Sequence, residues 1–351
     1  MTRNEKRQGT DEVKKPKVVV VVGNGFDLDL GYPTRYNDFV DSQWFDALIT
    51  GKLPRELLLE GKYQDNMQIY PNGLACYIKE QKEHNNWVDL EECIMEYALK
   101  SRSLMTSTEI LREVKALKYF LYQYIGRLTR QFKEYVLDRQ HKVAYRLITE
   151  LVQHDVDIEL WNFNYTYYCQ LVLEDNSCNS DFIHNKLHYI HSYLYEADQD
   201  KFSLVLGCNY TDELNDVCSS LIKSNMIHNY QEKKKLFDTH LAEAENIVFI
   251  GHSLGSTDQQ YFEDILESTN LQTITIITKS EGSLDSVRRN LGKITNGDFG
   301  KLQQKGKLNC LAFISDGYYE YPLGLGLEVV NQDKNDEYEK LLRKITTGQY
   351  L

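Results

Sequence analysis

Short apolar runs alternate with long, mostly polar stretches along the chain. The first run, residues 18–22, consists of five valines and ends at Gly23. An uninterrupted run of β-branched residues is typical of a central parallel strand that is covered on both faces. Similar runs predict further strands at residues 157–162, 186–190, 203–206, 246–250, 273–278 and 309–314. Their spacing predicts an α/β fold with a mostly parallel sheet.

Between the first two predicted strands, the pattern is that of helices. Apolar residues recur at helical spacing within residues 109–153, namely at Leu117, Phe120, Leu121, Tyr124, Ile125 and Leu128. A second charged helical segment is expected at residues 212–245. The pattern therefore predicts a flexible leader at residues 1–16, a core at residues 17–39 and 151–325, a helical insertion at residues 40–150 and a C-terminal helix at residues 326–351.

Composition restricts the class of protein. The 351 residues suffice for two domains or for one large domain with an insertion. Charged residues at 26% and aromatic residues at 12% exclude a wholly disordered or fibrous chain. With 40 Lys and Arg against 52 Asp and Glu, the net charge of −12 repels phosphate polymers and anionic lipid surfaces. We therefore expect neither a nucleic acid nor a membrane as a partner.

Cysteine usage and the first residues bear on the compartment. Seven scattered cysteines without a C-x-x-C pair argue against a disulfide framework and a structural zinc site. Residues 1–17 lack the apolar region of a signal peptide, and no segment reaches the roughly 20 apolar residues that span a bilayer. The expected compartment is the cytoplasm.

The loop after the first strand is the first candidate for chemistry. It consists of Gly23, Asn24, Gly25, Phe26 and Asp27. Glycines and a helix start at the end of a parallel strand let a nucleotide phosphate approach backbone N–H groups. The G-x-G-x-x-G fingerprint is not met, because residue 28 is leucine and the next glycine is Gly31. The alternative is a tight turn that needs glycine for geometry alone, with Asp27 as a helix cap.

The loop after residues 246–250 matches the G-x-S-x-G pattern of a serine hydrolase. It reads Gly251, His252, Ser253, Leu254 and Gly255. In α/β-hydrolases the acid and the histidine follow the serine in the chain, but no histidine follows His252 here. We therefore favour a ligand-binding loop with Ser253 and Asp258 at the ligand. A serine hydrolase that uses Ser253 is the alternative, as is Asp258 acting only as a helix cap.

Asn164 and His191 follow two further predicted strands. An asparagine both donates and accepts, so that it can position a water or a ribose hydroxyl. A neutral imidazole can act as a general base near pH 7. A turn for Asn164 and an ordinary boundary position for His191 are the structural alternatives. His184, His188 and His191 cannot share one face of a strand, so no metal site is predicted.

One further motif lies within the predicted insertion, at residues 87–92. Trp87 and Asp89 are expected to begin a helix, with Asp89 near its positive end. Glu91 is a candidate to reach the cleft.

Taken in order, these motifs resemble the AbiH family of bacterial phage abortive-infection proteins. The resemblance extends from residue 17 to about residue 265. It rests on residues 23–27 with Gly31, Thr34, Tyr36 and Phe39, on residues 87–91 and 163–166, on Ile190 and His191, and on residues 251–255 with Asp258. Membership of this family implies a cytoplasmic antiphage effector.

A more distant resemblance connects the chain to sirtuins and sirtuin-like antiphage NADases. The first-strand motif of these enzymes, G-A-G-I-S-x-x-x-G-I-P, has its glycines and proline at Gly23, Gly25, Gly31 and Pro33. Their T-Q-N-I-D motif is similar to residues 162–166, their H-G to His191-Ser192, and their G-T-S-L loop to residues 251–254. The zinc-binding cysteine pairs of sirtuins are missing, Ser192 replaces a glycine and Asp27 replaces a serine. These departures argue against protein deacylation.

The resemblance implies a Rossmann-like core that binds NAD or a related nucleotide and hydrolyses its N-glycosidic bond. Asn164 would orient the water and the ribose, and His191 would be the base. The expected nucleotide-binding residues are Gly23, Asn24, Gly25, Phe26, Asp27, Gly251, His252, Ser253 and Asp258. No tightly bound cofactor is expected, and NAD or a related nucleotide is the candidate ligand or substrate. The alternative is a non-catalytic module that senses a nucleotide and acts through a homo-oligomer or a phage-derived trigger.

Overall fold

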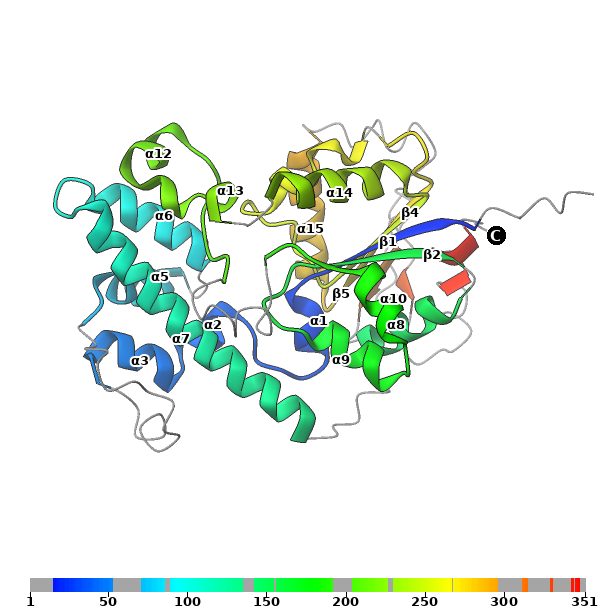
Figure 1. Cartoon of the computed structure of the whole chain (residues 1–351), viewed down its shortest axis with the longest axis horizontal. Coiled ribbons are helices and arrows are strands. Elements are labelled where there is room, and N and C mark those ends of the chain that lie inside the picture. The colour runs from blue at the N-terminus through cyan, green and yellow to red at the C-terminus, as the bar shows by residue number, and fades with distance from the viewer. Residues whose placement is uncertain are drawn as a thin grey trace, which may run out of the picture.

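The fold is seen in a computed structural model (Figure 1). It describes residues 15–52, 71–85, 89–134, 142–154, 156–191, 204–226, 230–266, 268–295, 311–314, 329–330, 342–343 and 345–347. Statements about structure below refer to these residues. Most of the predicted leader, together with Trp87, Ser192 and Cys310, lies outside them.

A parallel sheet forms the centre of the molecule. It has seven strands in the order β3-β2-β1-β4-β5-β6-β7, and every described pairing is parallel. The strands are β1 (Lys17–Val22), β2 (Asp157–Asn162), β3 (Leu187–Tyr189), β4 (Asn246–Ile250), β5 (Thr273–Thr278), β6 (Leu311–Ile314) and β7 (Val329–Val330). This order, with its reversal between β1 and β4, is that of doubly wound nucleotide-binding folds. The prediction of a Rossmann-like α/β fold is confirmed.

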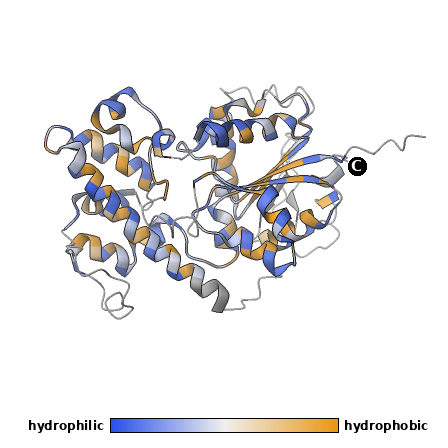
Figure 2. Ribbon diagram, in the orientation of Figure 1, coloured by the Kyte–Doolittle hydropathy of each residue, from blue (hydrophilic) through white to orange (hydrophobic). Residues whose placement is uncertain are grey.

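Helices cover both faces of the sheet. Because successive side chains of a strand point to opposite faces, the apolar residues of one strand pack against helices on both sides. Val18, Val20 and Val22 pack with α1 (Asn24–Asp29), α8 (Val143–Gln153) and α9 (Tyr168–Asp175). Val19 and Val21 pack on the other face. They contact a cluster built from α14 (Tyr230–Glu243), η3 (Gln259–Tyr261), η4 (Glu263–Leu266) and α15 (Glu281–Ile294). In Figure 2 the central strands are largely hydrophobic, whereas α14 is mostly hydrophilic.

A second hydrophobic core belongs to a group of helices beside the sheet, at the left of Figure 1. It contains α2 (Tyr36–Val40), α3 (Gln43–Thr50), α5 (Gly73–Asn85), α6 (Leu90–Ser101) and α7 (Ser107–Glu134). Residues 204–226 complete it with α12 (Asp212–Cys218), η2 (Ser219–Leu221) and α13 (Lys223–Met226). We call these helices together with residues 204–226 the helical unit. Its longest member, α7, buries the apolar stripe that the sequence predicts, from Leu117 to Leu128.

The predicted strands at residues 157–162, 246–250 and 273–278 are present with the same bounds. The strand predicted at residues 186–190 is shorter, at Leu187–Tyr189, and the one predicted at residues 309–314 is present at Leu311–Ile314, with residues 309 and 310 outside the described residues. The strand predicted at residues 203–206 is wrong: residues 204–206 join no sheet, and Leu204 and Leu206 are buried in the core of the helical unit. A short apolar run is equally suited to either environment, so its pattern alone does not decide.

The two predicted helical segments break into several helices. Residues 109–153 contain α7 and α8, and α8 packs on the sheet rather than on the helical unit. Near the C-terminus, residues 342–343 and 345–347 are helical, whereas Val329–Val330 pair as β7. A further short helix, α10 (Ser180–Lys186), precedes β3. Among the described helices, none combines the length and the apolar character needed to cross a membrane.

Candidate functional site

A cleft of about 1210 Å³ lies at the carboxyl ends of the strands, where the helical unit meets the sheet. Five loops line it, those that follow β1, β2, β3, β4 and β5, together with the start of α6. Among the predicted site residues, it collects Gly23, Asn24, Gly25, Asp27, Asn164, His191, Gly251, His252, Ser253 and Asp258. The parallel sheet explains this convergence, since all the carboxyl ends of its strands meet at one edge.

Phe26 is the predicted site residue that the cleft does not include. Its side chain is fully buried and packs with Val22 and Leu30 in the cluster beneath the sheet. Helix α1 begins at Asn24, so Phe26 turns toward the sheet while Asp27 stays at the cleft. The side chain of Phe26 therefore stabilises the fold and does not line the site.

The glycines of the β1 and β4 loops allow the two loops to cross in backbone contact. The N–H of Gly25 donates to the carbonyl of Gly251 at 2.8 Å. A Cβ on Gly25 would lie 2.5 Å from Cα of Gly251, and one on Gly23 would lie 2.5 Å from Cα of His252. Gly251 also has a φ of +62°, which side chains disfavour. The requirement for glycine here is thus fully explained by geometry, and phosphate contact remains a prediction.

Replacing Gly251 with alanine is expected to destabilise the fold by about 1–3 kcal/mol, because its Cβ would lie 2.4 Å from the backbone of Gly25. Denaturant unfolding followed by circular dichroism measures this effect. Gly282→Ala is the matched control, since a Cβ there meets no atom within 4 Å, and its expected change is within about 1 kcal/mol. Equal stability of the two variants would contradict the loop crossing.

Asn164 is held in one orientation by its neighbours. Its Nδ2 donates to the carbonyl of Gly23 at 3.0 Å and to Oδ1 of Asp27 at 3.1 Å. Its backbone N–H donates to Oδ1 of Asn162 at 2.9 Å, which is the turn that the sequence allows. Both amide hydrogens are therefore in use, and Oδ1 of Asn164 accepts no hydrogen bond from the described residues. Toward a ligand, this side chain can only accept.

The carboxyl group of Asp27 holds the side chain of Asn164 in place by accepting a hydrogen bond from its Nδ2. This carboxyl group is buried and also accepts a hydrogen bond from Oγ1 of Thr166 at 2.7 Å. Burial raises the pKa of Asp27 to about 7, although the hydrogen bonds from Thr166 and Asn164 oppose the rise. The side-chain hydroxyl of Thr166 was not among the predicted site residues, although it lies in the same motif as Asn164.

His191 and Asp258 form a pair across the cleft. Nε2 of His191 lies 3.1 Å from Oδ1 of Asp258, and its Nδ1 is buried without a hydrogen bond to any described residue. Burial, followed by the charge of Lys223, lowers the pKa of His191 below its ordinary value of 6.5. Nε2–H of a neutral imidazole thus donates a hydrogen bond to the ionised Asp258 carboxylate, which leaves Nδ1 as the basic nitrogen.

Asp258 is ionised because cationic and donor groups surround it. Burial alone would raise the pKa of its carboxyl group, but the ammonium of Lys223 and the hydrogen bonds of two histidines hold it well below the usual range. The second histidine, His252, accepts the N–H of Leu254 at its Nδ1 at 3.0 Å. Its proton therefore sits on Nε2, 3.6 Å from Oδ2 of Asp258. Asp258 acts as an acceptor for these groups, and its side chain does not cap η3.

Lys223 is a residue of the site that sequence reasoning missed. Its side chain is almost fully buried, with Nζ 2.8 Å from Oε2 of Glu91 and 3.1 Å from Oδ1 of Asp258. Burial raises the pKa of Glu91 to about 7, against the opposing charge of Lys223. Asp89 lies at the start of α6, as predicted, and caps it by accepting hydrogen bonds from the N–H groups of Glu91 and Glu92. In sequence, Lys223 is one of several lysines in a charged helical segment, so nothing in the local pattern distinguishes it.

The serine hydrolase interpretation finds no support around Ser253. Both ring nitrogens of His252 face other groups, and no described histidine forms a hydrogen bond with the Ser253 hydroxyl. The positive φ angles of this turn fall on Gly251 and Leu254 rather than on the serine. Ser253 is an exposed residue of the cleft wall.

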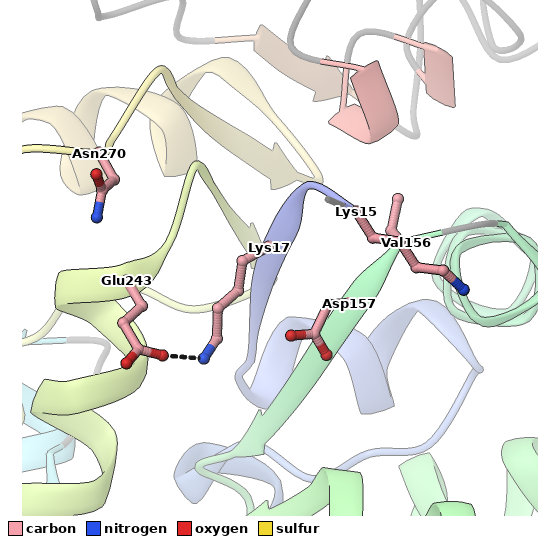
Figure 3. A pocket seen from close by; sticks show the side chains of 6 residues that line it. All are labelled: Lys15, Lys17, Val156, Asp157, Glu243 and Asn270. Carbon is pink, nitrogen blue, oxygen red and sulfur yellow. Dashed lines mark hydrogen bonds and ion pairs between the residues drawn. The ribbon is translucent and has the colours of Figure 1, made fainter. Parts of the chain in front are cut away.

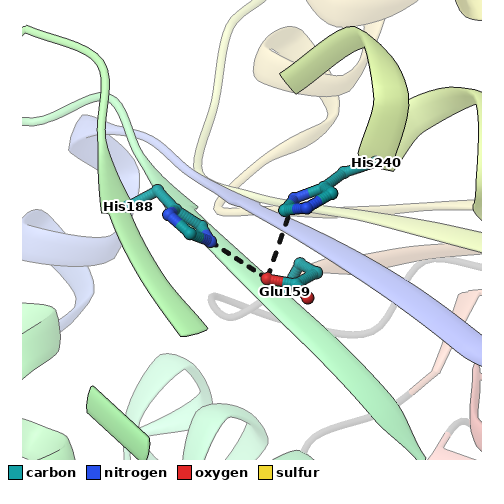
Figure 4. Close-up of side chains that lie close together, drawn as sticks. All are labelled: Glu159, His188 and His240. Atoms are coloured by element: carbon teal, nitrogen blue, oxygen red, sulfur yellow. Dashed lines mark hydrogen bonds and ion pairs between the residues drawn. The ribbon is translucent and has the colours of Figure 1, made fainter. Parts of the chain in front are cut away.

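Outside the cleft, the described residues also form a hollow lined by charged side chains and a cluster of one glutamate and two histidines. The hollow, of about 640 Å³, lies at the opposite ends of β1 and β2, where Lys17 pairs with Glu243 (Figure 3). The cluster joins Glu159, His188 and His240 from β2, β3 and α14 (Figure 4), with ligand-type atoms within 4.8 Å of one another. Sequence reasoning had grouped His188 with His184 and His191 instead.

Protein donors already occupy the cluster of Glu159, His188 and His240. Oε2 of Glu159 lies 3.0 Å from Nε2 of His188, and Oε1 lies 2.8 Å from Nζ of Lys186. The indole N–H of Trp161 donates to Nδ1 of His240 at 3.2 Å. Each of these atoms has a protein partner, so the group is a hydrogen-bonded network between the sheet and α14.

Comparison with known proteins gives one match. The family model described as "Bacteriophage abortive infection AbiH" matches residues 19–279, which include the cleft loops that follow β1, β2, β3 and β4. No curated protein and no solved structure matches the chain.

Proposed function

The chain belongs to the AbiH family of bacteriophage abortive infection proteins, and we propose that it acts in abortive infection by hydrolysing the N-glycosidic bond of NAD or a related nucleotide. One observation carries the proposal. Asn164 and His191 both line the cleft, and neither Oδ1 of Asn164 nor the buried Nδ1 of His191 has a hydrogen-bond partner among the described residues. Such a pair suits a water molecule that must lose a proton as it attacks.

The position of the cleft supports a nucleotide as the ligand. Open α/β sheets bind their ligands outside the carboxyl ends of the strands, where the strand order reverses. Here the reversal lies between β1 and β4, and the loops of both strands line the cleft. In the proposed complex, the loop of Gly23, Asn24 and Gly25 faces the phosphates, and Ser253 faces the ribose side.

The proposed hydrolysis requires little from the protein beyond positioning and one base. Water forms a bond to the anomeric carbon of the ribose, and the C–N bond breaks with its electron pair moving to the ring nitrogen of nicotinamide, which leaves as a neutral molecule. Oδ1 of Asn164 accepts a hydrogen bond from the water or from a ribose hydroxyl. Nδ1 of His191 takes the proton that the water loses, and Asp258 stabilises the resulting imidazolium.

The direct test is incubation of the purified full-length protein with NAD, followed by chromatography of nicotinamide and ADP-ribose. Release of both in equal amounts is expected. Saturable binding of NAD without release would instead favour a non-catalytic nucleotide sensor. Absence of both binding and release would contradict the proposal.

The sensor is the second candidate function because the cleft is physically connected to the helical unit. Lys223 joins Asp258 in the β4 loop to Glu91 in α6, so a ligand that moves Asp258 also disturbs the helical unit. In this case the helical unit would transmit nucleotide binding to a second copy of the chain or to a phage-derived trigger. Hydrolysis of NAD by the isolated protein distinguishes the two candidates.

A further inference from the structure

Lys223 occupies an environment that lysines seldom tolerate. Only 1% of its surface is exposed, although its ammonium group is charged. Three oxygens surround Nζ, those of Glu91 at 2.8 Å, of Asp258 at 3.1 Å and of the Thr257 carbonyl at 3.1 Å. The two carboxylates raise the pKa of Lys223, despite burial, which lowers it. A buried cation with this set of partners is held in one position.

The same oxygen of Asp258 serves both Lys223 and His191. Nζ of Lys223 and Nε2 of His191 each lie 3.1 Å from Oδ1 of Asp258. The carboxylate of Asp258 favours protonation of the His191 imidazole, and the nearby ammonium of Lys223 disfavours it. The two charges therefore offset each other's effect on the protonation of His191. The groups around the ring of His191 are Asp258, Lys223, His252, Phe163, Tyr165 and Tyr261.

We propose that Lys223 is a positioning residue of the site. Its ammonium group holds the Asp258 carboxylate at hydrogen-bonding distance from His191 and keeps the imidazole neutral. This inference rests on the proposed function only in taking His191 as the base. The second carboxylate that pairs with Lys223 belongs to Glu91 in α6, so the helical unit takes part in setting the charge of His191. The helical unit is therefore a component of the site and not only its cover.

The test is the pKa of His191, measured by NMR titration of protein with isotope-labelled histidines and assigned with His191→Ala. In the wild-type protein this pKa is expected below 6.5. In Lys223→Met it is expected to rise by about one unit or more, because Asp258 then acts on the imidazole without a compensating cation. Where NAD hydrolysis is measurable, the acidic limb of its pH profile moves to higher pH by the same amount.

Lys118→Met is the matched control. Lys118 is also buried in the helical unit and lies near Glu91, but no ion pair or hydrogen bond among the described residues links it to Asp258 or His191. The pKa of His191 is expected to stay unchanged in this variant. A rise of equal size in both variants would show a general effect of losing a buried lysine and would overturn the proposal.

A double variant allows the pKa of His191 to be measured even if Lys223→Met alone does not fold. Lys223→Met alone leaves the Glu91 carboxylate buried without its cation, whereas Lys223→Met with Glu91→Gln removes one charge of each sign. The same rise in the pKa of His191 is expected in the double variant. An unchanged pKa in whichever variant folds, or a wild-type value above 6.5, would overturn the proposal. The titration needs no turnover, so this result is independent of whether NAD is hydrolysed.

Discussion

Replacing Asn164 with alanine is expected to lower the rate of nicotinamide release by about 100-fold or more at saturating NAD, with a much smaller change in KM. The substitution removes Oδ1, the acceptor that would hold the attacking water or the ribose hydroxyl. It also leaves the carboxyl group of Asp27 and the carbonyl of Gly23 without their shared donor. The loss should therefore fall on the chemical step rather than on nucleotide binding.

The measurement is a steady-state assay of nicotinamide release for the wild-type protein and the variant. Asn176→Ala is the matched control, because Asn176 is a partly buried asparagine that bonds with Tyr145 outside the cleft. Its rate is expected to equal that of the wild type. A normal rate in Asn164→Ala would exclude Asn164 from the reaction.

Replacing His191 with alanine is expected to lower the same rate by about 100-fold or more, and to remove the acidic limb of the pH profile. The base works only as neutral imidazole, so the wild-type rate should fall as the pH drops through the pKa of His191. Burial lowers this pKa, which places the midpoint of the fall below pH 6.5. The wild-type protein should thus retain its rate at a more acidic pH than an exposed histidine would allow.

His188→Ala is the control for this prediction, since His188 belongs to the network with Glu159 and lies outside the cleft. Its rate and pH profile are expected to match those of the wild type, although its stability should decrease. Glu91 and Asp27 are the alternative assignments of an acidic limb, because burial raises the pKa of each to about 7. An acidic limb that survives in His191→Ala would assign the limb to Glu91 or Asp27 and would contradict the role of His191 as the base.

The sequence predicts the sheet and most of the cleft for one physical reason. The five β-branched valines of β1 favour a strand that is buried on both faces, as it is in the structure, and such strands are typical of parallel sheets. In a parallel sheet every strand ends at the same edge, so the loops that carry Asn164, His191 and Asp258 must converge there. Local patterns therefore suffice for these residues, although they are far apart along the chain.

The features that sequence reasoning missed depend on long-range packing. Lys223 gains its role only because residues 204–226 fold against α6, which brings Glu91 within 2.8 Å. The apolar residues of the same segment, Leu204 and Leu206, have the pattern of a strand and fill the core of the helical unit instead. Phe26 was predicted at the site because its neighbours are there, but the turn of α1 directs its side chain into the core.

The construction of the helical unit from two separate stretches of chain has a consequence for biosynthesis. Its core requires residues up to 222, and the ion pair that completes the cleft requires Asp258. During synthesis from the N-terminus, α2 to α7 leave the ribosome with an incomplete core, which residues 204–222 complete only after β2 and β3 have been made. A nascent or prematurely terminated chain that stops before residue 258 lacks the Asp258–His191 pair. The proposed hydrolysis would thereby be confined to chains whose synthesis has passed that residue.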